Sequence, residues 1–205
     1  MLRIHGRGLR IGVLVRDPAL ARRVVEAARS HGFRPVWVLS PEELPLGTEV
    51  AIHEGPVGLP PVLSGVSVRK EDDPEKTLLR ALYIVASRRP GRLEVAIDPG
   101  SRSGAVFVKG GMILCSGVFN GNAELLDAVR SVSVSIGEDP RVFYVGSTSN
   151  GSAAELVDLL RSSFPGSKVV MVPEGPMRDL RVPDDLKGDE LDAYFIYLRA
   201  VSSRA

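Results

Sequence analysis

The sequence of 205 residues predicts an α/β protein made of two units. Apolar residues make up 44% of the chain and charged residues 25%, which is typical of a globular protein with a buried core. Strand and helix patterns alternate in the first half, whereas three strands come first in the second half. A segment rich in Arg, Pro and Gly, residues 87–92, lies between the halves. We therefore expect a small open α/β unit at residues 1–90 and an α/β unit with a mixed sheet at residues 91–205.

The first unit follows the order β-α-β-β-β-α, which predicts an open sheet with largely parallel strands. Asp17 and Pro18 begin its first helix, as a capping acid and a proline at the first helical position, and Gly32 ends it. Asp73 and Pro74 begin the second helix in the same way. Strands are expected at residues 9–15, 36–39, 49–53 and 66–68, with a Pro- and Gly-rich loop at residues 54–65.

The second unit follows the order β-β-β-α-β-α-β-α. Gly110 and Gly111 form a two-residue hairpin turn between its second and third strands. Asn122 caps the first helix, and Gly188 or Asp189 begins the last one. Strands are expected at residues 93–98, 104–109, 112–119, 141–146 and 168–173, and the middle helix at residues 152–163. This is the order of the ribonuclease H-like fold, whose first strand is central and carries an acid.

Asp98 ends the first strand of this unit, and the turn Pro99-Gly100 follows it. An ionised carboxylate in a sheet core must be paired or bound to a cation, so Asp98 is a candidate metal ligand if other acids converge on it. The local alternative is an Asp that caps the Pro-Gly turn through its own backbone.

Two further places supply carboxylates. Glu174 follows the fifth strand, at the carboxyl end where open α/β sheets bind ligands. Asp189 and Asp192 are three residues apart in the last helix and share a face, whereas Glu190 points elsewhere and is expected to be solvated. Each acid also has a structural alternative: a helix cap for Asp189, a loop residue for Glu174, and a rim acid paired with Arg199 for Asp192.

Residues 98–101 and 189–193, with the sequences Asp-Pro-Gly-Ser and Asp-Glu-Leu-Asp-Ala, resemble the first and last motifs of the RuvC-type Holliday junction resolvases. Those enzymes have a glutamate in the fourth strand, and this chain does not. The chain is more similar to the related YqgF (RuvX) family of Holliday junction resolvase-like and pre-16S ribosomal RNA nucleases. In that family a Val-Gly turn ends the fourth strand, as at Val145 and Gly146 here, and the glutamate lies in an Asp-Glu-Arg motif after the fifth. This chain keeps only Glu174 of that motif.

The resemblance covers about residues 92–202 and implies a metal-dependent nuclease acting on structured DNA or RNA, either in junction resolution or in ribosomal RNA processing. It implies Mg²⁺ or Mn²⁺ held by four acids, with Asp98 as the bridging ligand: Asp98, Glu174, Asp189 and Asp192. Basic and small polar side chains would bind nucleic acid: Arg102, Arg178, Arg181, Lys187, Ser147, Thr148 and Asn150. A solvated loop and simple helix capping are their alternatives. A resolvase that cuts symmetrically needs two active sites, which makes a homodimer an expectation.

Other interpretations stay open. A catalytically degenerate ribonuclease H-like module that binds nucleic acid or protein is favoured by the missing fourth-strand acid. An actin-like phosphotransferase ranks low, because the chain is too short for the two domains that would enclose ATP. A receiver-like first unit lacks a clear phosphoacceptor, since His53 and Glu54 end its third strand.

Charge and composition add further limits. Residues 1–90 carry 14 basic against 10 acidic side chains (+4) and residues 91–205 carry 12 against 15 (−3), which suits a polyanionic substrate held by one unit and cut by the other, or is surface noise. No apolar run approaches the ~20 residues that cross a bilayer, and the first residues lack the apolar core of a signal peptide, so we expect a cytoplasmic protein without membrane contact. The single cysteine, Cys115, is expected to be a buried inert thiol and excludes zinc sites built on Cys.

Overall fold

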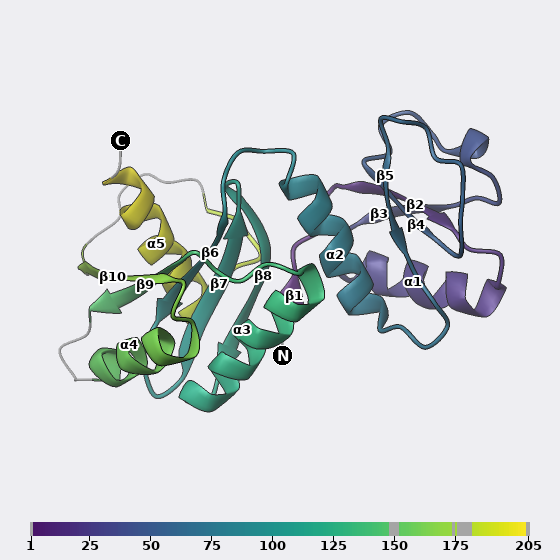
Figure 1. Cartoon of the computed structure of the whole chain (residues 1–205). Helices are drawn as coiled ribbons and strands as arrows, with labels where there is room; N and C mark the ends of the chain where they lie inside the picture. The colour runs from purple at the N-terminus through teal and green to yellow at the C-terminus, as the bar shows by residue number, and fades with distance from the viewer. Residues whose placement is uncertain (1, 148–151, 174, 176–181, 204–205) are drawn as a thin grey trace. The chain divides into compact units, whose positions relative to one another are not determined.

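The computed structural model describes residues 2–147, 152–173, 175 and 182–203. The chain divides into two compact units, one of residues 4–90 and one of residues 1–3 together with 91–205. Both are drawn in Figure 1. The N-terminal residues thus belong to the same unit as the second half of the chain.

Residues 4–90 form a four-stranded sheet in the order β3-β2-β4-β5, in which all neighbouring strands are parallel. The elements are β2 Arg10–Leu14, α1 Pro18–Ser30, β3 Arg34–Trp37, the 3-10 helix η1 Pro41–Glu43, β4 Val50–His53, β5 Ser64–Ser67 and α2 Pro74–Ala86. This is the parallel α/β sheet that the sequence predicts. β5 begins earlier than expected and takes Ser64 and Gly65 from the predicted loop.

Both helices of this unit begin as the sequence predicts. The carboxylate of Asp17 accepts hydrogen bonds from the backbone N–H groups of Ala19 and Leu20 at 2.9 and 3.5 Å. The carboxylate of Asp73 accepts one from Glu75 at 2.9 Å. A proline follows each acid at the first helical position, where its missing N–H costs nothing.

The second unit contains a six-stranded sheet in the order β1-β8-β7-β6-β9-β10. β7 is antiparallel to β6 and β8, whereas β9 is parallel to β6 and β10 is parallel to β9. The strands are β1 Arg3–Ile4, β6 Leu93–Asp98, β7 Ser103–Lys109, β8 Met112–Phe119, β9 Val142–Ser147 and β10 Lys168–Pro173. Counted from β6 along the chain, the spatial order is third, second, first, fourth, fifth. The predicted ribonuclease H-like topology is confirmed, and β1 is an additional strand that no pattern in the sequence indicated.

The hairpin between β7 and β8 turns at Gly110 and Gly111, whose φ angles are 56° and 78°. Two positive φ angles in succession favour glycine, which explains this pair. Cys115 of β8 is fully buried, and burial raises the pKa of its thiol. It is therefore the inert thiol that the sequence predicts.

Three helices cover the sheet of the second unit within the described residues: α3 Asn122–Ile136, α4 Ser152–Ser163 and α5 Asp189–Ser202. Asn122 is the first residue of α3, and the cap is Gly121 instead. On one face of the sheet, Ala96 of β6 lies in a buried cluster with Ala193 and Ile196 of α5. Because side chains alternate along a strand, Asp98 lies on the same face as Ala96. Figure 1 shows α3 and α4 on the other side of this sheet from α5.

Candidate functional site

Asp98 is the last residue of β6, which lies between β7 and β9. Its side chain is half-buried on the face that α5 covers. In the ladder with β7 it stands opposite Gly104. The sheet thus places this acid at the carboxyl end of its central parallel strand, as the fold predicts.

Two glycines on the neighbouring strands let α5 approach this end of the sheet. A Cβ atom on Gly104 would lie 1.9 Å from the backbone oxygen of Asp189, far inside van der Waals contact. A Cβ on Gly146 of β9 would lie 2.7 Å from Cδ1 of Ile196. No packing role was predicted for Gly104, and Gly146 was expected in a Val-Gly turn that ends the fourth strand, whereas it lies within β9. A glycine inside a strand signals such a close approach.

A cavity of about 340 Å³ lies where β6 and α5 meet. Two predicted site residues, Asp98 and Asp192, line it from different elements. Its remaining lining residues are Gly175, Phe195, Ile196 and Arg199. The structure therefore brings two carboxylates, 94 positions apart in numbering (192 − 98), to one space.

Asp189 begins α5 and does not line this cavity. Its Oδ2 atom is buried and has no hydrogen-bond partner among the described residues. The charge is offset by Arg102, whose Nη2 lies 3.1 Å from that oxygen in an ion pair without hydrogen-bond geometry. Since the Arg102 side chain is 66% exposed, water weakens this interaction.

Glu190 is buried, which corrects the expectation that it is solvated. Only 6% of the residue is exposed. Its Oε1 atom accepts a hydrogen bond from the Ser116 hydroxyl of β8 at 2.8 Å, and its Oε2 atom lies 3.5 Å from Nη1 of Arg3. The position of Glu190 in the helix predicted exposure to solvent. The sequence did not reveal its partners, because Ser116 and Arg3 lie far from it along the chain.

Arg199 lies two turns after Asp192 on α5 and binds the end of β10. Its Nη1 donates to the backbone oxygen of Pro173 at 3.4 Å, and its Nη2 donates to that of Gly175. The Nε atom is buried without a partner among the described residues. The guanidinium thus fixes the strand end next to Glu174 while it lines the cavity of Asp98 and Asp192.

Several predicted site residues lie outside the described residues: Glu174, Thr148, Asn150, Arg178 and Arg181. Ser147 ends β9 and is half-buried, and Lys187 is exposed just before α5. Within the described part of the chain, no three His, Cys, Asp or Glu side chains are arranged to hold a metal ion. Among the described acids, Asp98 and Asp192 form a pair, and Asp189 lies at the start of the same helix as Asp192. The expected cluster of four acids depends on Glu174.

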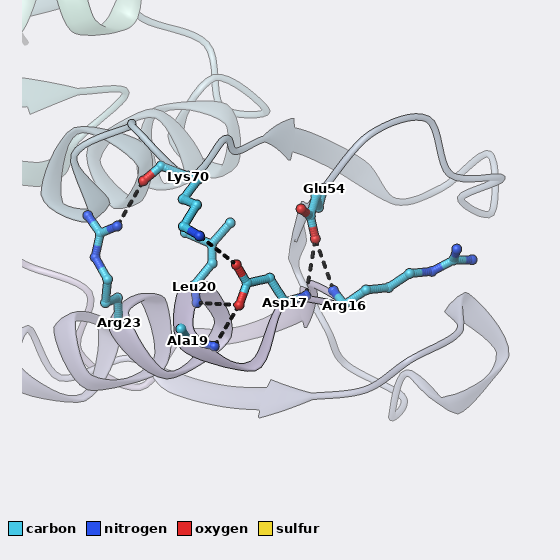
Figure 2. Close-up of polar contacts among 7 residues, drawn as sticks. All are labelled: Arg16, Asp17, Ala19, Leu20, Arg23, Glu54 and Lys70. Carbon is cyan, nitrogen blue, oxygen red and sulfur yellow. Dashed lines mark hydrogen bonds and ion pairs between the residues drawn. The ribbon is translucent and has the colours of Figure 1, made fainter.

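The carboxyl end of the sheet in residues 4–90 has a polar cluster of its own, drawn in Figure 2. Glu54 follows β4, and its Oε2 atom accepts hydrogen bonds from the backbone N–H groups of Arg16 and Asp17 at 3.2 and 3.3 Å. Lys70 lies 3.8 Å from Asp17, and Arg23 donates to the backbone oxygen of Lys70 at 2.8 Å. These contacts tie together the segments that follow β2, β4 and β5.

This cluster leaves the start of α1 without N–H groups for an external anion. Glu54 uses those of Arg16 and Asp17, and Asp17 uses those of Ala19 and Leu20. A cavity of about 600 Å³ adjoins the cluster and is lined in part by Arg16 and Glu54. Asp17 and Glu54 therefore act within the fold of this unit, and neither is placed as a free phosphoacceptor.

The strand order and the acid at the end of the central strand define a ribonuclease H-like domain in residues 91–205.

No protein-family model matches the chain, and no curated protein matches it significantly. Among the described residues, no helix combines the length and apolar character needed to span a membrane.

Solved structures of Argonaute proteins are similar to the chain at low TM-scores. The Argonaute of Marinitoga piezophila with guide RNA and target DNA is 12% identical, with a TM-score of 0.31 over 83% of this chain and 40% of that one. The same Argonaute with guide RNA alone is 13% identical, with a TM-score of 0.31 over 82% and 40%. The Argonaute of Clostridium butyricum with guide and target DNA is 11% identical, with a TM-score of 0.29 over 82% and 35%. The chain thus spans less than half of these proteins, and its fold class rests on its own strand order.

Proposed function

We propose that residues 91–205 form a metal-dependent nuclease domain that hydrolyses phosphodiester bonds in structured DNA or RNA. The observation that carries this proposal is the cavity shared by Asp98 of β6 and Asp192 of α5. Asp98 and Asp192 stand on a strand and on a helix, and sites built on such elements are more precise than sites built on loops.

The donor chemistry at this cavity fits Mg²⁺ or Mn²⁺. Both are hard cations that prefer carboxylate oxygens, and Asp98 and Asp192 would hold one. Asp189 does not line the cavity and is proposed as a further donor from the start of the same helix, because its buried Oδ2 lacks a hydrogen bond among the described residues. Glu174 is the proposed fourth acid, beside the strand end that Arg199 binds. The bound ion would supply an activated water and offset charge on the phosphate in the transition state.

The RuvC and YqgF families are the proposed relatives, and the packing of β9 favours the second. Gly146 lies near the carboxyl end of β9 and faces Ile196 of α5. A glutamate side chain at that position would have to displace Ile196. This supports an acid on β10 in place of one on the fourth strand, as in the YqgF family.

The proposed nucleic-acid contacts surround these acids. Arg102 is exposed beside Asp189, and Lys187 is exposed just before α5. Arg178, Arg181, Ser147, Thr148 and Asn150 complete the proposed set. Cationic side chains of this kind bind phosphates without reading bases. A symmetric cut would need two such sites, so a homodimer is part of the proposal.

A second candidate function is a catalytically degenerate module that binds nucleic acid or protein. Two guanidinium groups favour it, since Arg102 offsets the charge of Asp189 and Arg199 lines the cavity of Asp98 and Asp192. Positive charges near the acids lessen the attraction that a divalent ion would feel.

Titration of the full chain with Mn²⁺, monitored by calorimetry and by water-proton relaxation, distinguishes the nuclease from the binding module. We expect binding at micromolar to millimolar Mn²⁺, weakened at least tenfold by Asp98→Asn and by Asp192→Asn. Asp127→Asn is the matched control, because Asp127 is an exposed acid on α3, its side chain 78% exposed. Cleavage of branched DNA and of structured RNA with Mg²⁺, lost in chelator and in Asp98→Asn, would identify the substrate. A parent chain that binds no Mn²⁺ at millimolar concentration would overturn the nuclease and leave the binding module as the remaining candidate.

A further inference from the structure

Glu190 is a buried carboxylate in the first turn of α5, between two of the proposed site residues, Asp189 and Asp192. Only 7% of its side chain is exposed. A buried carboxylate is tolerated when it is both paired and hydrogen-bonded. Ser116 provides the hydrogen bond at 2.8 Å and Arg3 provides the opposite charge at 3.5 Å.

The start of α5 has no side-chain cap. Its N-cap residue is Gly188, with φ 53° and no capping side chain. The backbone N–H groups of Leu191 and Asp192 both donate to the Gly188 oxygen, at 2.8 and 3.0 Å. An uncapped first turn frays readily, so other contacts must hold this one closed.

Arg3 links three segments of one compact unit. It belongs to β1, at the edge of the six-stranded sheet beside β8. Its Nη1 atom donates to the backbone oxygen of Asp185 at 2.6 Å and pairs with Glu190 of α5. One guanidinium thus binds both the segment before α5 and its first turn.

We propose that Arg3 and Glu190 are a positioning pair, which holds the first turn of α5 closed so that Asp189 and Asp192 stay beside Asp98. This inference rests on the proposed function of that site. Neither member of the pair lines the cavity of Asp98 and Asp192, so both act through the backbone of α5.

The different exposures of the two partners predict an asymmetry between substitutions. Arg3→Ala leaves a buried charge unpaired, whereas Glu190→Gln leaves an arginine that is 51% exposed and reaches water. We therefore expect Arg3→Ala to weaken Mn²⁺ binding at least tenfold, which corresponds to a first turn that is closed at most about a tenth of the time. Glu190→Gln should have a smaller effect, and the double variant should bind Mn²⁺ more tightly than Arg3→Ala alone. Arg3→Lys keeps the charge and should stay close to the parent.

Amide hydrogen exchange measured by NMR reports how often the first turn of α5 opens, and it needs no metal ion. Arg3→Ala should speed exchange at Leu191 and Asp192 at least tenfold while Ile196 and Tyr197, later in α5, stay near parent rates. Arg130→Ala is the matched control, because Arg130 is 54% exposed and pairs with Asp127 on α3.

The outcomes separate the two proposals. Faster exchange confined to the first turn, with recovery in the double variant, supports the positioning pair even if the parent binds no Mn²⁺, a result that would overturn the nuclease alone. Parent-like exchange and parent-like Mn²⁺ binding in both Arg3→Ala and Glu190→Gln would overturn the pair. If Arg3→Ala does not fold, Glu190→Gln and Arg3→Lys are compared instead. Faster exchange at Leu191 and Asp192 in Glu190→Gln than in Arg3→Lys supports the positioning pair, and equal or slower exchange would overturn it.

Discussion

Asp98 and Gly104 stand opposite each other in the β6–β7 ladder, and the absent side chain of Gly104 leaves the space that the backbone of Asp189 occupies. The pair thus connects the central acid of the sheet to the helix that carries Asp189 and Asp192. Any side chain at residue 104 would push the start of α5 away from β7 and so away from Asp98.

Gly104→Ala should therefore lower both stability and metal binding. The new Cβ would meet the backbone oxygen of Asp189 at 1.9 Å, and backbone cannot rotate away as a side chain can. We expect a loss of about 1–3 kcal/mol in the free energy of unfolding, measured by urea denaturation, with weaker Mn²⁺ binding. Gly146→Ala is the comparison, since its new Cβ would meet Cδ1 of Ile196 at 2.7 Å and Cδ of Pro99 at 3.4 Å but no backbone atom, and it should cost less. Equal effects of the two substitutions would argue against this account.

Asp17→Ala should destabilise the chain without affecting the metal site. Asp17 caps α1 through Ala19 and Leu20 and also pairs with Lys70 (Figure 2). Loss of such a cap costs about 1 kcal/mol, and the exposed Lys70 adds little. Urea denaturation should show this decrease, while the Mn²⁺ affinity of the variant should match that of the parent. A change in Mn²⁺ affinity would mean that residues 4–90 influence the site.

Stability should fall at high pH because of Tyr197. Burial, followed by the charges of Glu94 and Tyr194, raises the pKa of Tyr197 to about 12. In the unfolded chain a tyrosine titrates near pH ~10. Between these values the unfolded state loses the proton and the folded state keeps it, so the free energy of unfolding decreases as the pH rises through this window.

Urea denaturation at several pH values across that window, combined with the ultraviolet absorbance of tyrosinate, tests this prediction. Tyr197→Phe should flatten the decrease, because the substituted side chain has no proton to lose. Below about pH 9, the free energy of unfolding of the variant should differ from that of the parent by no more than the roughly 0.5–3 kcal/mol that most single substitutions cause. Parallel pH profiles for parent and variant would assign the decrease to other groups.

Features set by neighbouring residues could be predicted from the sequence. Asp17 and Asp73, each followed by proline, mark helix starts through local hydrogen bonds. Gly110 and Gly111 mark a tight hairpin because their φ angles are a property of the turn itself. Together with strand periodicity, such signals gave the element order, and the element order gave the fold class.

Features that depend on distant contacts could not be predicted. Glu190 was expected in solvent because nothing near it in the sequence binds it, and its partners Ser116 and Arg3 come from β8 and β1. β1 itself is two residues long, too short to produce a pattern. A glycine inside a strand indicates that something approaches closely, but the sequence around Gly104 and Gly146 does not indicate that α5 is what packs there.

The pairing of Arg3 with Glu190 has a consequence for the order in which the chain is made. Arg3 is synthesised before residues 4–90 and Glu190 after them, so one whole compact unit lies along the chain between the two members of the pair. Residues 4–90 can fold as soon as they emerge, whereas Arg3 can pair with Glu190 only after residues 91–190 have also been synthesised. The proposed metal site should accordingly form later on a nascent chain than the unit of residues 4–90.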